Sequence, residues 1–258
     1  MIKNLQVIKI LMKINIKIDS TKKEYPVVYV YMAESIDGKA SGEVLNAPAS
    51  LFGKNYYFSH QYSYGSKSIL LGRSTFEIFL GWIKAGPLDY KGITTENIEK
   101  KDYLSENRNK TEYYYITIDK NGKLPFPKGF GSFGGKEEIH IITILSEEID
   151  LKYLAYLQKI GVSYIFAGEK TIDLKVALKK LKDLFGIEKI ICEGGPSTTQ
   201  TLLNENLVDK LIILKHPCIA QPGSLPVFGN ANLSEWNLES FEMLSDKQHL
   251  LIIYQKRN

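Results

Sequence analysis

The sequence predicts an α/β domain with a central, mostly parallel sheet and an antiparallel pair of strands near the C-terminus. Short apolar runs alternate with helical patterns from residue 26 onward, which is the βαβ rhythm of parallel sheets. The first run, residues 27–32, is apolar on both faces, as expected of a central strand that helices cover from both sides. Residues 239–244 and 248–254 show two strand patterns separated by a short turn, which favours an antiparallel closing pair.

The other elements follow from hydrophobic period and from boundary residues. We expect further strands at residues 68–72, 113–118, 138–142, 162–167, 189–192 and 210–214, and helices at 49–64, 150–160 and 173–185. Two more helices should begin directly after strands, because Ser74 with Glu77 and Ser197 with Gln200 have the spacing of a capping box. The polar residues 81–112 form a long connection, expected to be a lid, an insertion or a partly disordered loop.

Charge separates the first 24 residues from the rest of the chain. They hold six lysines against Asp19 and Glu24, which accounts for the whole net charge of +4. Isoleucine or methionine occupies the even positions from 8 to 18, which predicts an edge strand or a pairing segment for another subunit; a poorly ordered tail is the alternative. We therefore divide the chain into a basic N-terminal extension, residues 1–24, and one domain, residues 25–258.

Composition argues against several classes of protein. The domain has balanced charge, so it lacks the basic face typical of a nucleic-acid binder. Its two cysteines and four histidines are scattered, which argues against a disulfide scaffold and against a metal site. No apolar run reaches the length of a membrane span, and lysines interrupt the N-terminal apolar pattern, which no signal-peptide cleavage site follows. We expect a cytoplasmic protein.

The strongest chemical motif is residues 190–200, Ile-Ile-Cys-Glu-Gly-Gly-Pro-Ser-Thr-Thr-Gln. A buried strand ends, two glycines follow, and a new helix begins. Adjacent glycines let the backbone approach a ligand closely, and the free amides of a helix start favour a phosphate or pyrophosphate. A purely structural strand-to-helix turn is the alternative.

Residues 70–75, Leu-Leu-Gly-Arg-Ser-Thr, repeat this strand–glycine–helix pattern. Arg73 adds a planar cation suited to a phosphate monoester, such as the 2′-phosphate that distinguishes NADP from NAD. A surface ion pair is the plainer interpretation of this arginine. A third segment, residues 33–39, Ala-Glu-Ser-Ile-Asp-Gly-Lys, follows the first strand at the sheet edge where open α/β sheets place ligands.

These three segments, in this order, together with Leu207-Val-Asp-Lys-Leu211 and Pro226-Val-Phe-Gly229, resemble the reductase domain of riboflavin biosynthesis. That domain is the C-terminal half of bacterial bifunctional deaminase–reductases and also occurs as stand-alone reductases. The resemblance runs over most of residues 27–255 and implies a dihydrofolate-reductase-like three-layer sandwich. The chain shows no deaminase signature, H-x-E with P-C-x-x-C, so we interpret it as a reductase alone.

Carried over residue by residue, the resemblance implies a site. With the two helix starts, it assigns NADPH binding to Ala33, Gly72, Arg73, Ser74, Thr75, Gly194, Gly195, Pro196, Ser197, Thr198 and Thr199. Ser35, Asp37 and Glu193 would contact the substrate. Asp37 and Glu193 are the candidate catalytic residues, and the proton could come from either of them or from a bound water.

We therefore expect hydride transfer from NADPH to a C=N or C=O group of a ribosylaminopyrimidine similar to 5-amino-6-(5-phosphoribosylamino)uracil. An orphan reductase of another pterin or carbonyl compound, or a non-catalytic NADP-binding protein on the same fold, are the alternatives. A protein-interaction module that uses the tyrosine-rich residues 49–64 is a weaker one. The resemblance and the apolar C-terminal strands also predict a homodimer.

Overall fold

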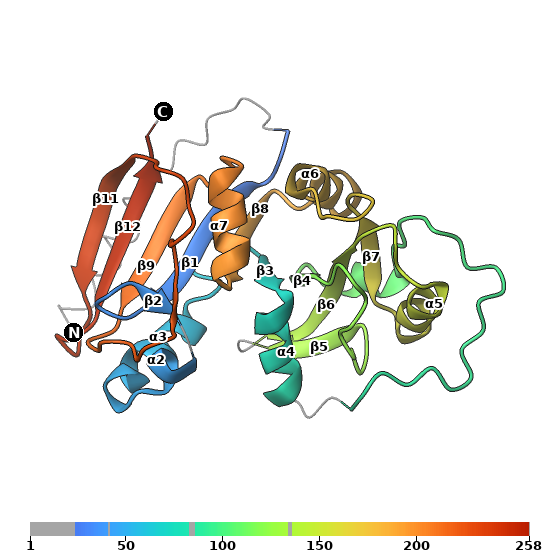
Figure 1. The fold of residues 1–258 in the computed structure, drawn as a ribbon, viewed down its shortest axis with the longest axis horizontal. Coiled ribbons are helices and arrows are strands. Elements are labelled where there is room, and N and C mark those ends of the chain that lie inside the picture. Colours follow the sequence, from blue (N-terminus) through green and yellow to red (C-terminus); the bar gives the residue numbers. More distant parts are fainter. Residues whose placement is uncertain (1–23, 41, 83–85, 134–135, 258) are drawn as a thin grey trace.

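The computed structural model describes residues 24–40, 42–82, 86–133 and 136–257, and it confirms the mixed α/β architecture (Figure 1). The predicted N-terminal extension lies outside the described residues, apart from Glu24. In the described part of the chain, no helix is long and apolar enough to cross a membrane.

A large sheet runs through the whole domain. Its strands follow the order β11-β12-β9-β1-β8-β3-β4-β6-β5, and β7 also pairs with β6. Their bounds are β1 (Val27–Glu34), β3 (Ser68–Gly72), β4 (Tyr114–Ile118), β5 (Phe130–Phe133), β6 (Lys136–Leu145), β7 (Ser163–Phe166), β8 (Lys189–Gly194), β9 (Lys210–Lys215), β11 (Trp236–Met243) and β12 (Leu250–Lys256).

Most of the sheet is parallel, as the sequence predicts. The pairings β9–β1, β1–β8, β8–β3, β3–β4, β4–β6 and β6–β7 are parallel. The pairings β11–β12 and β12–β9 are antiparallel, which confirms the closing pair, and β5 adds a further antiparallel edge to β6. A separate small ribbon joins β2 (Lys39–Ala40) to β10 (Leu225–Pro226).

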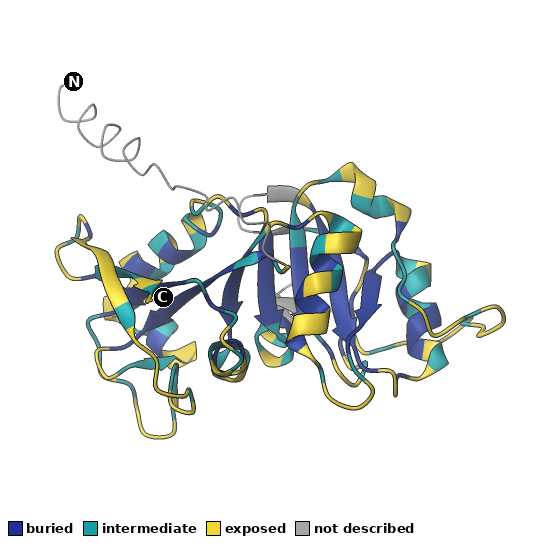
Figure 2. Ribbon diagram, turned by 90° about the horizontal axis from the view of Figure 1, so that it is seen from above, coloured by how far each residue is buried: buried dark blue, intermediate teal, exposed yellow. Residues whose placement is uncertain are grey.

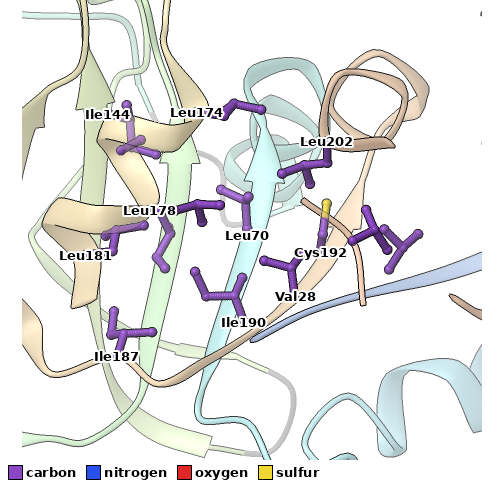
Figure 3. Close-up of a cluster of buried hydrophobic side chains, with 14 of the residues drawn as sticks. Val28, Leu70, Ile144, Leu174, Leu178, Leu181, Ile187, Ile190, Cys192 and Leu202 are labelled. Atoms are coloured by element: carbon purple, nitrogen blue, oxygen red, sulfur yellow. The ribbon is translucent and has the colours of Figure 1, made fainter. Parts of the chain in front are cut away.

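Helices cover both faces of the sheet, giving three layers (Figure 2). Alternate residues of β1 show the division: Val28 and Val30 face α6 (Leu174–Phe185) and α7 (Pro196–Asn204), whereas Tyr29 and Tyr31 belong to the opposite core. Tyr57 of α3 (Leu51–Ser59) belongs to that opposite core. Side chains of α4 (Arg73–Trp82) and α5 (Leu151–Ile160) form a third cluster with Ile69 and Leu71 of β3. The α6 and α7 side is a continuous aliphatic cluster that includes Ile190 and Cys192 of the central strand β8 (Figure 3).

Several predicted boundaries are wrong. The tyrosine-rich segment is not one helix over 49–64; a 3₁₀ turn, Pro48–Ser50, precedes α3, which ends at Ser59, and a further short helix, α2, spans Gly42–Asn46. Helix α4 begins at Arg73 rather than Ser74. Helix α7 has Gly195 as its N-cap with no side-chain cap, so Ser197 does not start it.

The residue that should complete this predicted capping box has another partner. Gln200 donates to the carbonyl oxygens of Pro226 and Val227, at 3.1 and 3.3 Å. The Gln200 side chain therefore makes a long-range contact that the local S-x-x-Q pattern does not predict.

Candidate active site

A cavity of about 420 Å³ opens at the carboxyl ends of β1, β8 and β3, three neighbours in the sheet. Its volume falls in the range of small-molecule sites. One wall consists of the starts of α4 and α7, and the opposite wall of α2, α3 and the small β2–β10 ribbon. The lining residues are Met32, Ala33, Ala40, Gly42, Leu45, Asn46, Lys54, Tyr57, Phe58, Gly72, Arg73, Ser74, Thr75, Ile78, Glu193, Gly195, Pro196, Ser197, Thr198 and Leu225.

The two predicted helix starts pack against each other in this wall, because glycines let their backbones approach. A Cβ atom on Gly72 would lie 2.6 Å from Thr198 Oγ1 and 3.1 Å from the carbonyl oxygen of Gly194. A Cβ on Gly195 would lie 3.1 Å from Thr75 Oγ1. Each glycine thus makes room for the hydroxyl of the other helix, so the two strand–glycine–helix turns interlock.

The start of α7 exposes backbone donors to the cavity wall. Gly195 has φ 37° and ψ 164°, a conformation that a residue with a side chain rarely adopts. The first amides of a helix have no intrahelical acceptor, and no side chain caps those of α7. This arrangement suits an anion, as the sequence predicts.

Arg73 stands at the start of α4 and lines the same wall. Its guanidinium pairs with Glu77 one turn later, at 2.5 Å, and both side chains are 41% exposed. Arg73 therefore forms a surface ion pair, as the plainer interpretation of the sequence predicts, and it also lines the cavity.

Glu193 lies at a break in the pairing of the sheet. Leu70 pairs with Cys192 and Leu71 pairs with Gly194, so the β8–β3 register passes over Glu193. Bulges of this kind are common beside active sites. Cys192 belongs to the core under α6 and α7, whereas Glu193 contacts Gln61, in the turn that follows α3 on the other face.

The carboxyl group of Glu193 is almost completely buried. Gln61 Nε2 donates to Glu193 Oε2 at 2.6 Å, and Oε1 has no hydrogen-bond partner among the described residues. Burial raises the pKa of Glu193 to about 8, while the hydrogen bond from Gln61 acts in the opposite direction. The group therefore holds a proton at neutral pH, which a carboxyl in water does not.

Four predicted site residues lie outside the lining. Ser35 is fully buried; its Oγ donates to Asp37 Oδ1 at 2.6 Å, and the amide of Ala220 donates to the same oxygen at 3.0 Å. These two hydrogen bonds hold the pKa of Asp37 below its usual value, and the bond from Ser35 has the larger effect. Gly194 and Thr199 pack behind the turn, where a Cβ on Gly194 would lie 2.9 Å from Thr199 Oγ1. The loop of Ser35 and Asp37 leads directly into β2, whose Ala40 does line the cavity.

Sequence reasoning assigned no residue of the opposite wall to the site, although aromatic residues at the spacing seen in residues 49–64 are often core or the wall of a pocket for a flat ligand. Lys54, Tyr57 and Phe58 of α3 line the cavity, and the aromatic density of this segment was the only signal for them. Tyr57 is locked to β1, because its hydroxyl donates to the carbonyl oxygen of Tyr31 at 2.9 Å and the two rings stack at 4.3 Å. No local pattern marked Lys54 or Gln61.

Comparison with known proteins shows what the chain is similar to. The family described as the RibD C-terminal domain matches residues 26–250. A 2,5-diamino-6-ribosylamino-4(3H)-pyrimidinone 5′-phosphate reductase of Archaeoglobus fulgidus is 21% identical over 223 residues, which cover 86% of this chain and 94% of the relative.

Two solved structures share the fold. A pyrimidine reductase-like protein of Corynebacterium diphtheriae superposes with a TM-score of 0.62 at 20% identity, covering 90% of this chain and 92% of the other. The riboflavin biosynthesis reductase of Saccharomyces cerevisiae gives a TM-score of 0.56 at 17% identity, with 91% of each chain covered.

Proposed function

Because the chain belongs to the family of RibD C-terminal domains, and is therefore an oxidoreductase, we propose that it uses NADPH to reduce a ribosylaminopyrimidine 5′-phosphate. The Archaeoglobus relative is named as such a reductase. The observation that carries the proposal is the cavity itself, which combines two helix starts on one wall with a buried, proton-holding carboxyl group at Glu193.

The residues present fit a nicotinamide dinucleotide. Gly195 leaves a space beside Thr75 that a Cβ would fill, and the uncapped amides of α7 border it. We assign the phosphates of NADPH to the two helix starts, Gly72–Thr75 and Gly195–Thr198, with Arg73 at the 2′-phosphate. Ala33 would border the nicotinamide end. Gly194 and Thr199 would support this turn from behind. When bound, NADPH supplies the hydride.

The opposite wall fits the substrate. Tyr57, Phe58 and Leu45 offer flat and apolar surfaces for a pyrimidine, and Lys54 is the cation on this wall. Lys54 Nζ is held at 2.7 Å from Asn46 Oδ1, also a lining residue. We propose that Lys54 binds the 5′-phosphate, and that Ser35 and Asp37 act on the substrate side by fixing the loop that carries β2.

Glu193 is the proposed proton donor. Reduction of a C=N or C=O bond needs a hydride at carbon and a proton at the heteroatom, and a carboxyl that is neutral at pH 7 can supply the proton. The lowered pKa of Asp37 and its exposed position make Asp37 a less suitable donor.

We also propose a homodimer. Leu238, Phe241 and Met243 of β11 are 55%, 70% and 61% exposed. Phe241 and Met243 stand opposite Ile252 and Leu250 of β12 in the register, so they share one face of the sheet. A second copy would cover this apolar face. A cytoplasmic location suits the same proposal, since Cys192 and Cys218 are free thiols.

Loss of NADPH absorbance in the presence of candidate substrates tests the proposed function. The panel contains 2,5-diamino-6-ribosylamino-4(3H)-pyrimidinone 5′-phosphate, its dephosphorylated form and dihydrofolate. We expect turnover of the phosphorylated compound and a large rise in KM without the phosphate. Lys54→Ala should raise KM for the phosphorylated compound only. Turnover of dihydrofolate alone would replace the proposed substrate by a pterin.

A further inference from the structure

Gln61 is an unusual residue for its position in the fold. It lies in the turn that follows α3, yet its side chain is fully buried. A buried amide costs free energy unless it is hydrogen-bonded, so glutamine is mostly found at the surface. Its Nε2 donates to Glu193 Oε2 at 2.6 Å, across 132 positions of the sequence. The amide is therefore directed at the one buried carboxyl group of the cavity wall.

The turn that carries Gln61 is anchored. The amide of Ser63 donates to the carbonyl oxygen of His60 at 2.9 Å, which closes the turn. Immediately before it, Tyr57 fixes α3 to β1 through the bond to Tyr31. Both supports are local to the cavity, so the amide group is held in place before any ligand binds.

The amide also distinguishes the two oxygens of Glu193. In a neutral carboxyl group, the carbonyl oxygen is the better acceptor, and the other oxygen carries the hydrogen. Because Gln61 donates to Oε2, the neutral form has its carbonyl at Oε2 and its hydroxyl at Oε1. Oε1 is the oxygen that lacks a partner among the described residues. The hydrogen therefore sits on the oxygen that no protein group engages.

The other titratable groups that face Glu193 carry no charge at pH 7, so none of them can take over the effect of the Gln61 hydrogen bond on the carboxyl group. They are the phenols of Tyr31 from β1, Tyr57 from α3, Tyr62 and Tyr64 from the turn and Tyr115 from β4, together with the thiol of Cys192. Burial raises the pKa of every one of these groups, that of Cys192 to about 12, so all are neutral at pH 7. Gln61 also lies close to the phenol of Tyr115, on β4, which is separated from β8 by β3 in the sheet.

We propose that Gln61 is a positioning residue that fixes the carboxyl group of Glu193 and keeps its transferable hydrogen on Oε1. The inference rests on the proposed role of Glu193 as the proton donor. It adds that the orientation and acidity of this donor are set by the turn after α3.

The test replaces the amide by a side chain of similar length without a donor, Gln61→Met, with Gln61→Leu as a second variant. Gln158→Met is the matched control, because the Gln158 amide donates to the hydroxyl of Tyr164 at 2.8 Å, outside the cavity lining. Steady-state kinetics over pH uses NADPH and the ribosylaminopyrimidine phosphate. In parallel, ¹³C NMR of glutamate-labelled free protein follows the titration of Glu193, whose signal is assigned with Glu193→Gln.

We expect kcat at pH 7 to fall about two- to tenfold, with KM for NADPH changed less than about twofold, since the lost hydrogen bond joins two neutral groups at this pH. Because the Gln61 bond lowers the pKa of Glu193, its loss should move both the NMR titration and the alkaline limb of kcat upward by about one pH unit. A general loss of structure lowers kcat without this upward displacement.

Two outcomes overturn the proposal. An unchanged Glu193 titration in both folded Gln61 variants shows that the amide does not act on the carboxyl group. A raised pKa of Glu193 with unchanged kcat shows that the position of the Glu193 carboxyl group does not matter for turnover. Failure of the proposed function is seen separately, as a wild type that does not oxidise NADPH with the phosphorylated compound. Full activity of Glu193→Gln would remove Glu193 as the proton donor, whatever the Gln61 variants do to the NMR titration.

Discussion

Glu193→Gln tests the burial of this carboxyl group without reference to activity. The pKa of Glu193 rises from 4.5 to about 8 in the folded protein. Between these two values the folded state binds one proton more than the unfolded state, so the free energy of unfolding of the wild type falls as pH rises. A difference of about 3.5 in pKa corresponds to about 5 kcal/mol in total.

Glutamine has nearly the same shape and does not ionise, so this dependence should disappear in the variant. Subtracting the two stability curves cancels every other titrating group. We expect the variant to gain about 1.4 kcal/mol over the wild type for each pH unit, or about 4 kcal/mol between pH 5 and pH 8. Above about pH 9 the difference should become constant, because the wild-type group is then ionised in both states.

Guanidinium denaturation at unit steps from pH 5 to pH 9 measures this difference. Glu96→Gln, at an exposed position of the long connection, reports the effect of the same substitution away from the cavity. A difference between Glu193→Gln and wild type that stays constant from pH 5 to pH 8 would refute the reasoning, because Glu193 would then titrate alike in the folded and unfolded states.

Three further predictions concern the cofactor wall and the assembly. Arg73→Ala should weaken NADPH binding at least about tenfold and leave NADH binding nearly unchanged in a fluorescence titration. Glu77→Gln is the control for the lost ion pair, and equal losses for both cofactors would remove Arg73 from the 2′-phosphate. Gly195→Ala should abolish NADPH binding and lower the free energy of unfolding by about 1–3 kcal/mol. Gly186→Ala, also at positive φ but outside the cavity lining, should lower stability alone. Normal NADPH affinity in Gly195→Ala would contradict phosphate binding at the start of α7. Phe241→Asp should convert the dimer to a monomer in light scattering, and a wild type that is already monomeric argues against the dimer.

Local patterns in the chain predicted the elements that depend on neighbours in the sequence. The apolar run at 27–32 and the helical period at 173–185 correspond to β1 and α6, because hydrophobic period reports directly which side of an element is buried. The two strand–glycine–helix turns were predictable for the same reason, since each is complete within about six residues. The starts of helices were predicted less well. The capping pattern at Ser197 predicted the wrong start for α7, because Gln200 forms hydrogen bonds with residues 226 and 227 instead.

The sequence by itself therefore determined the α/β class, the approximate order of strands and helices along the chain, and the two strand–glycine–helix turns. Only the tertiary structure decided that β8 lies between β1 and β3, so that Gly72 meets Thr198 and Gly195 meets Thr75. It also decided the break in the β8–β3 pairing at Glu193 and the hydrogen bond between Glu193 and Gln61. The physical reason is that strand neighbours, bulges and buried hydrogen bonds depend on free energies between segments far apart in the chain, which no local period or spacing records.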